Sequence, residues 1–326
     1  MRLSHTGKGL LTCTLLLAAS VIHAQSAYPT RPMRMIVPFP AGGSTDIVGR
    51  VVAQKLSERL GQPMVVDNRG GAGGTIGTDV AAKSAPDGHT LSIGTTSTHA
   101  VAVGAYSKLA YHPVRDFAPV SLVAITPYLL VVNPQVGPKT LKDFITLVKG
   151  SPGRFNYGSA GNGSATHLAM EMLKDVAQMN IVHVPYKGNA QTDLAVLGNE
   201  VQAVFGSMPA LLQHVKAGKL LPLAVGTAAR SPALPEVATV AEQGFAGFEA
   251  ALWLGVFAPA GTPAPVVQRL HRELVAIAGT PDFKDAMAKN GAEALSSATP
   301  EEFTKLVGEE AARYSKVVRA LGIKLD

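Results

Sequence analysis

Cysteine is almost absent from this chain: the single cysteine among 326 residues is Cys13, close to the N-terminus. A chain with one cysteine forms no internal disulfide and offers no cysteine-based metal site. Aromatic residues make up only 6% of the chain and charged residues 16%, whereas 47% is hydrophobic. A globular chain of this length buries enough apolar surface to be stabilised by its core alone.

Motifs of several enzyme classes are also missing. The chain has no Gly-x-Ser-x-Gly nucleophile turn, no phosphate-binding P-loop and no His-Glu-x-x-His zinc motif. Its lysines and arginines are scattered, so the formal net charge of +6 does not predict a nucleic-acid surface. These absences argue against a hydrolase, an oxidoreductase and a nucleic-acid-binding protein. We expect no cofactor, no metal and no catalytic residue.

The first 24 residues have the composition of a secretory signal peptide. Arg2 and Lys8 form a basic start, and residues 9–22 form an apolar stretch too short for a comfortable membrane span. Ile22-His23-Ala24 then provides an acceptable cleavage signal. We therefore predict that residues 1–24 are removed on export and that the mature chain is periplasmic.

Two glycine-rich turns are the most informative features of the remaining chain. The first spans residues 39–46 after an apolar run, and the second spans residues 159–164 after Phe155-Asn156-Tyr157. A segment with helical periodicity follows each turn. A helix start offers unpaired N–H groups and the positive end of the helix dipole, and glycines allow close approach to the backbone. The pair predicts a small anion held between two lobes.

Short β-rich runs alternate with amphipathic helical segments from Arg31 onwards. This order predicts an α/β fold with mostly parallel strands and crossover helices. We expect helix 45–60 to begin at Ser44 or Thr45 as the N-cap, and a strand at 128–132 to open the second lobe. The predicted lobes are residues 25–125 plus 227–326, where three C-terminal helices return to the first lobe, and residues 126–226.

Five blocks of the sequence resemble one known family. They are Val37-Pro38-Phe39-Pro40-Ala41-Gly42-Gly43, residues 68–77, residues 159–168, His183-Val184-Pro185-Tyr186-Lys187-Gly188, and residues 253–263. In this order they resemble the Bug family of periplasmic solute-binding proteins, which are related to tripartite tricarboxylate transporters. The blocks span nearly all of the predicted mature chain.

The resemblance implies a two-lobed, type II periplasmic binding-protein fold with a mostly parallel sheet in each lobe and a ligand cleft between the lobes. The implied ligand is a small organic carboxylate, and the implied partners are membrane permease subunits or a sensor protein. We expect a monomer that binds no nucleic acid. An extracytoplasmic enzyme acting on a carboxylate in the same cleft is the alternative.

Both turns supply the predicted ligand-binding residues, together with hydroxyls at the end of a strand and two residues near the second turn. They are Phe39, Pro40, Ala41, Gly42, Gly43, Thr95, Ser97, Ser159, Ala160, Gly161, Gly163, Ser164, His167 and Tyr186. Asp46 follows the first turn, where helix stabilisation is its expected role because a carboxylate would repel an acidic ligand.

This chain departs from the family pattern where members often carry acids. Ala195 and Gly206 occupy those positions, and Asp193 lies two residues before the first. Both changes would remove negative charge near the expected cleft, where an ammonium group would need a counter-ion. We therefore expect an acid without a cationic group.

Overall fold

The computed structural model describes residues 28–325, so the predicted signal peptide lies outside the described residues. Its strands run side by side in the order β2-β1-β3-β9-β4-β7-β5-β6, with β8 and β10 also paired to β4. They are β1 (Met33–Val37), β2 (Met64–Asn68), β3 (Thr90–Thr95), β4 (Phe117–Val132), β5 (Asn156–Ser159), β6 (Val182–Pro185), β7 (Ala203–Ser207), β8 (Leu221–Val225), β9 (Ala251–Pro259) and β10 (Glu293–Ala294).

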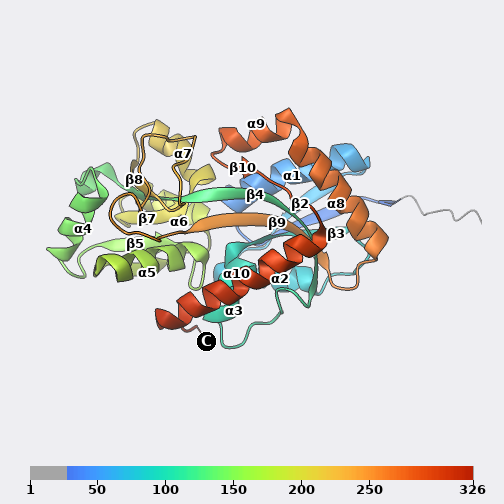
Figure 1. Ribbon diagram of the computed structural model, residues 1–326, viewed down its shortest axis with the longest axis horizontal. Coiled ribbons are helices and arrows are strands. Elements are labelled where there is room, and N and C mark those ends of the chain that lie inside the picture. Colours follow the sequence, from blue (N-terminus) through green and yellow to red (C-terminus); the bar gives the residue numbers. More distant parts are fainter. Residues whose placement is uncertain (1–27, 326) are drawn as a thin grey trace, which may run out of the picture.

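Helices cover both faces of this sheet (Figure 1). They are α1 (Ser44–Leu60), α2 (Thr75–Ala82), α3 (Ala102–Ala105), α4 (Leu141–Lys149), α5 (Ala165–Ala177), α6 (Asn189–Leu197), α7 (Met208–Lys216), α8 (Ala264–Gly279), α9 (Pro281–Lys289) and α10 (Pro300–Ala320), with short turns η1 (Ala72–Gly74), η2 (Ser97–Val101) and η3 (Pro134–Val136). Within the described residues, no helix is both long and apolar enough to span a membrane.

Local sequence explains where several of these helices begin and end. The hydroxyl of Thr140 accepts a hydrogen bond from the backbone of Asp143 and caps α4. Gly61 ends α1 in the left-handed region, with φ of 68°. The predicted N-cap of α1 is wrong by one residue: Gly43 occupies that position, and Ser44 is the first helical residue.

Strands β4 and β9 connect two groups of elements (Figure 1). The first half of β4 pairs antiparallel with β9, from Phe117 opposite Pro259 to Pro127 opposite Ala251. From Tyr128 onwards, β4 pairs antiparallel with β7, and β8 pairs with the same half. The parallel pairs expected from the β-α-β order are present at the outer strands, β1 with β2 and β3, and β5 with β6 and β7. The central antiparallel pairs were not predicted.

We propose that these two groups are the predicted lobes. The pairing of β4 changes between Pro127 and Tyr128, close to the crossing predicted near Ile125. Residues 227–250, however, still pack with the second group, because Leu234 and Val237 belong to the same buried cluster as residues of β7, β8 and α7. We therefore propose that the second lobe extends to about residue 250.

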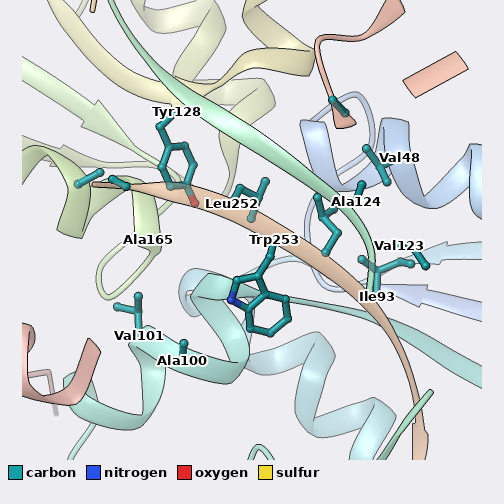
Figure 2. Packing of buried hydrophobic residues seen from close by; sticks show 14 of the residues in the cluster. Val48, Ile93, Ala100, Val101, Val123, Ala124, Tyr128, Ala165, Leu252 and Trp253 are labelled. Carbon is teal, nitrogen blue, oxygen red and sulfur yellow. The ribbon is translucent and has the colours of Figure 1, made fainter. Parts of the chain in front are cut away.

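Tight packing around β9 leaves no room for a side chain at two glycines. A Cβ added to Gly255 would lie 2.1 Å from Phe303 of α10, and one added to Gly94 of β3 would lie 2.3 Å from Phe257. Trp253 packs on the same face, and Figure 2 shows its indole pointing from β9 toward Ala100 and Val101. These contacts fix α10 and the aromatic residues against the strand that joins the two groups.

Gly255→Ala is expected to lower the free energy of unfolding by about 2 kcal/mol, because the added methyl overpacks the contact with Phe303. Urea denaturation measures this change. The matched control is Gly308→Ala on α10, where a Cβ meets no atom within 4 Å; this variant should be about 0.5–1 kcal/mol more stable because alanine favours a helix. A Gly255→Ala protein as stable as the wild type would contradict the packing described here.

Candidate functional site

A small closed cavity lies between the two groups of elements. Its lining comes from the start of α1, the ends of β3 and β5, the strands β4 and β9, and the starts of α5 and α6, namely Phe39, Gly43, Ser44, Thr45, Ser97, Tyr128, Ala160, Thr166, Asn189 and Leu252. The cavity has a volume of about 10 Å³, which is space for about one water molecule. None of the lining side chains carries a charge, so any recognition here depends on hydroxyls, one amide and backbone groups.

The first glycine turn presents the N-terminus of α1 to this cavity. Gly42 adopts φ of 82°, which only glycine adopts readily, and the N-cap Gly43 provides no side-chain cap. Asp46 faces away from the cavity and holds the turn, accepting hydrogen bonds of 2.9 Å from the Gly42 N–H and the Asn68 side chain. Burial alone would raise the pKa of this carboxyl, but hydrogen bonds from Arg50, Gly42 and Asn68 hold the pKa below its usual value.

Three helix N-termini without side-chain caps converge beside Gly43. They belong to α1, α6 and α7, whose N-caps are Gly43, Gly188 and Ser207. A Cβ added to Gly43 would lie 3.6 Å from the backbone nitrogen of Ala190 in α6. The Asn189 amide donates to the Ser207 hydroxyl at 2.9 Å, and that hydroxyl is also hydrogen-bonded to Ser44. The starts of three helices therefore lie close together, and helix starts favour an anion.

Helices elsewhere in the described chain show that this lack of capping is not general. Thr140, Thr280 and Thr299 cap α4, α9 and α10 by accepting hydrogen bonds from backbone N–H groups of the first turn. A cap satisfies one of the donors that a helix start leaves unpaired. At α1 and α6 the glycine caps leave these donors available beside the cavity.

The second glycine turn satisfies most of its own hydrogen bonds. The Ser159 hydroxyl accepts from the Gly161 N–H at 3.1 Å and lies 2.6 Å from Nε2 of His183. Ser164 caps α5 by accepting from the His167 N–H at 3.2 Å. Gly163 donates its N–H to Nδ1 of His167 at 3.3 Å. These bonds fix the shape of the turn and leave Ala160 as its residue on the cavity.

Two histidines support this turn from behind. The rings of His167 and His183 stack with their centroids 4.0 Å apart. Burial lowers the pKa of His167, and burial together with the neighbouring His167 and Lys174 lowers the pKa of His183 to about 3. Both rings are therefore neutral near pH 7, which leaves Nδ1 of His167 able to accept from Gly163.

Direct contacts hold the two groups of elements together around the cavity. Ser97 of the first group accepts a hydrogen bond of 2.9 Å from the Ala165 N–H of α5. The Tyr106 hydroxyl lies 2.9 Å from the carbonyl oxygen of Ala72, in the loop around η1, and 3.1 Å from that of Asn162, in the second glycine turn. A Cβ on Gly73 would lie 2.8 Å from the Asn162 carbonyl oxygen, so the two loops touch backbone to backbone.

The structure brings four of the predicted ligand-binding residues onto the cavity: Phe39, Gly43, Ser97 and Ala160. The other predicted residues do not line it, namely Pro40, Ala41, Gly42, Thr95, Ser159, Gly161, Gly163, Ser164, His167 and Tyr186. Pro40, for example, fits against Gly70 and Gly188, where an added Cβ would approach its ring within 2.8 and 2.6 Å. Ligand contact by any of these residues remains a prediction.

Sequence reasoning did not propose six of the lining residues as ligand contacts: Ser44, Thr45, Tyr128, Thr166, Asn189 and Leu252. Thr166 and Asn189 lie within or directly after family-like blocks, so the blocks themselves were a usable signal. Tyr128 and Leu252 carried no such signal, because they reach the cavity through the unpredicted antiparallel arrangement of β4 and β9.

The positions where family members carry acids do not line the cavity. Ala195 is buried in an apolar cluster, and a Cβ added to Gly206 would lie 2.8 Å from Leu211 and 3.6 Å from the carboxyl of Asp193. Asp193 is 5% exposed, and its Oδ1 has no hydrogen-bond partner among the described residues. The expectation that both changes remove charge from the cleft therefore finds no support in this geometry, and the uncharged lining is the better argument against a cationic ligand.

With the geometry established, comparison with known proteins identifies the family. Residues 48–323 match the model of the tripartite tricarboxylate transporter family receptor. The chain belongs to this family. Its relatives include Protein BugT of Bordetella pertussis (strain Tohama I), which is 39% identical over 318 residues covering 97% of each chain.

Solved structures of family members superpose closely on this chain. The periplasmic binding protein BugD is 35% identical and gives a TM-score of 0.88, covering 91% of this chain and all of that chain. Rpa4515 of R. palustris, solved with adipate, is 36% identical and gives a TM-score of 0.89 over the same shares. The expected fold class is thereby confirmed as the two-lobed α/β fold of periplasmic binding proteins, and these relatives are binding proteins.

Burial raises the pKa of Asp193 to about 8, well above its ordinary 3.8. Because the folded state favours the neutral carboxyl, this group's contribution to stability is present below pH 3.8 and declines as pH rises from there toward 8. Asp193→Asn should therefore be more stable than the wild type at pH 8, by at least about 1 kcal/mol, and equally stable at pH 3.5. Thermal denaturation at both values measures this. An equal difference at both values would contradict an ionisation effect.

Proposed function

We propose that this protein is a periplasmic solute-binding protein that captures a small organic carboxylate between its two lobes. The convergence of the N-termini of α1, α6 and α7 on a cavity without charged side chains carries the proposal. Such helix ends bind an anion through N–H donors and aligned dipoles. The adipate in the related Rpa4515 structure supports a carboxylate as that anion.

The carboxylate is held by neutral groups in this proposal. Gly43 and Asn189 bring two helix starts within contact distance, and the hydroxyls of Ser44 and Ser207, which are hydrogen-bonded to each other, lie at the same point. Hydrogen bonds to a charged acceptor are stronger than those between neutral groups, so a few aligned donors can offset the loss of water around the carboxylate. Phe39 and Leu252 offer apolar contact to the carbon chain.

Capture proceeds by closure, and no covalent bond is made or broken. A ligand shifts an open–closed equilibrium by as much as it prefers the closed form. The interior of about 10 Å³ is smaller than an acid of several carbons, so the lobes are separated further in the complex than here. The contacts of Ser97 and Tyr106 across the cleft are the ones that adjust.

Export and delivery complete the proposed role. Residues 1–24 direct the chain to the periplasm, where the closed form docks as a monomer on membrane permease subunits or on a sensor protein. The membership in a transporter receptor family supports this proposal. The enzyme alternative is not favoured, because Ser159, which faces His183 as a nucleophile would face a base, is fully buried and does not line the cavity.

Titration of the purified protein with mono- and dicarboxylates, adipate included, tests this function. The only tryptophan of the chain is Trp253, on β9 next to the lining residue Leu252. Its fluorescence is therefore expected to change when an acid closes the cleft, and calorimetry should give the matching dissociation constant. Absence of binding by every acid at micromolar protein concentration would refute the proposed function.

Gly43→Asp is expected to abolish carboxylate binding while the protein stays folded. The added Cβ meets no atom closer than 3.6 Å, and aspartate is a preferred N-cap, so its carboxylate would occupy the donors of α1. Gly43→Ala has the same backbone requirement without the charge and is the matched control, which should retain binding within about tenfold. Unchanged affinity in Gly43→Asp would show that the carboxylate binds elsewhere.

A further inference from the structure

The segment that follows α10 folds back beside α3 (Figure 1). The chain leaves α10 through Gly322, whose φ of 68° is one that glycine adopts readily, and residues 323–325 come next. The Leu325 N–H donates to the carbonyl oxygen of Ala105 at 2.7 Å, and the Leu325 carbonyl oxygen accepts from the Ser107 N–H at 3.1 Å. Two backbone hydrogen bonds therefore anchor this segment to the first group of elements.

Leu325 and its neighbour Tyr106 also reach the second glycine turn through their side chains. A Cβ added to Gly163 would lie 2.5 Å from Cδ1 of Leu325 and 2.9 Å from the ring of Tyr106. The Tyr106 hydroxyl lies 3.1 Å from the carbonyl oxygen of Asn162 in the same turn. Burial raises the pKa of Tyr106, so this hydroxyl keeps its proton and can donate it. We call Tyr106 and residues 323–325 the strap.

The strap is attached unequally to the two groups. On the side of the first group it is continuous with α3 and α10, and Tyr106 and Leu325 form a short parallel bridge. On the side of the second group it offers one hydroxyl and van der Waals contact with a glycine. The net gain from a single neutral hydrogen bond is small. The contact with the second group can therefore break while both groups stay folded.

The strap meets the second group directly beside the cavity. Gly163 stands two residues before Ala165, whose N–H is hydrogen-bonded to the cavity residue Ser97. A cavity of about 10 Å³ holds about one water molecule, so the two groups must separate before an organic acid can enter. Separation at this edge parts Gly163 from Leu325 and Tyr106.

We propose that the strap is an autoinhibitory contact, which holds the two groups in this compact arrangement and must release Gly163 before a solute enters. The apparent affinity of a protein is reduced by the fraction of its molecules that are competent to bind. A strap that favours the compact form therefore weakens binding and slows entry. The inference goes beyond the proposed function, because it concerns the protein before it binds, and only its affinity measurement rests on that function.

Hydrogen–deuterium exchange of Leu325→Ala, without added acid, tests the strap. Loss of the contact with Gly163 should speed exchange in residues 159–168 about three- to tenfold, because the Ala165 N–H is exposed whenever the two groups part. Exchange in β1 should stay unchanged, since its ladder bonds lie within the first group. Calorimetry and stopped-flow mixing with the carboxylates named above should show about three- to tenfold tighter binding and faster association in the variant.

Leu306→Ala is the matched control. Leu306 is a partly buried leucine of α10 that packs against the same buried cluster as Leu325, and it is not among the atoms nearest Gly163. This control should lower thermal stability without changing exchange in residues 159–168 or the affinity for any acid. Tyr106→Phe is a second, milder variant, because it keeps the ring against Gly163 and removes only the hydroxyl. It should change exchange and affinity in the same direction as Leu325→Ala.

The outcomes separate the strap from the proposed function. Wild-type exchange in residues 159–168 of both Leu325→Ala and Tyr106→Phe would overturn the strap. Unchanged or weaker acid binding in both variants would also overturn it, because release of an autoinhibitory contact raises affinity. Equal effects in Leu306→Ala would count against it as well, since they would reflect general stability. Failure of every acid to bind the wild type would refute the proposed function alone, and the exchange measurement would still decide on the strap.

Discussion

The antiparallel pair of β4 and β9 is the constraint on which the rest of this structure depends. It extends from Phe117 opposite Pro259 to Pro127 opposite Ala251, and β4 then continues as the partner of β7 and β8. One continuous strand therefore belongs to both halves of the sheet. Because a hydrogen-bonded ladder fixes the relative register of its strands, this pair sets where the helix starts of the two halves meet.

The meeting point has an unusual distribution of hydrogen bonds. Glycine and serine caps leave the starts of α1, α6 and α7 open, whereas threonine side chains cap α4, α9 and α10. The start of α5 at the same cavity is capped by Ser164, so the open helix starts among the lining elements are those of α1 and α6, whose N-caps are glycines. The glycines at 73 and 161 extend this pattern, since they let the two loops approach each other at backbone distance. The proposed anion site is thus lined by neutral side chains and backbone groups.

Sequence reasoning located the two glycine turns next to the cavity, because local patterns mark them. The first turn was found because an apolar strand, a glycine pair and a helical period follow one another within about 15 residues, although the N-cap is Gly43 and not Ser44 or Thr45 as predicted. The second turn was also found, but the prediction that its residues present donors to a ligand remains untested. In the structure, the hydroxyls of Ser159 and Ser164 accept hydrogen bonds from the N–H groups of Gly161 and His167, so these groups are paired within the turn and the start of α5. Whether a serine hydroxyl or an N–H group bonds within the turn or to a ligand depends on side-chain positions, and the spacing of residues in the sequence does not predict these positions.

The sequence by itself determined the α/β class, most of the helices and strands, the family and the position of the first glycine turn, because each depends on patterns within a short stretch of chain. Only the tertiary structure decided that Tyr128, Asn189 and Leu252 face the same cavity as Gly43. It also decided that a Cβ at Gly206 would meet Leu211 and Val204 before the carboxyl of Asp193. Tyr128 and Leu252 are brought together by the antiparallel pairing of β4 with β9, two segments more than 100 residues apart, and long-range register follows from packing of the whole chain and not from any local sequence signal.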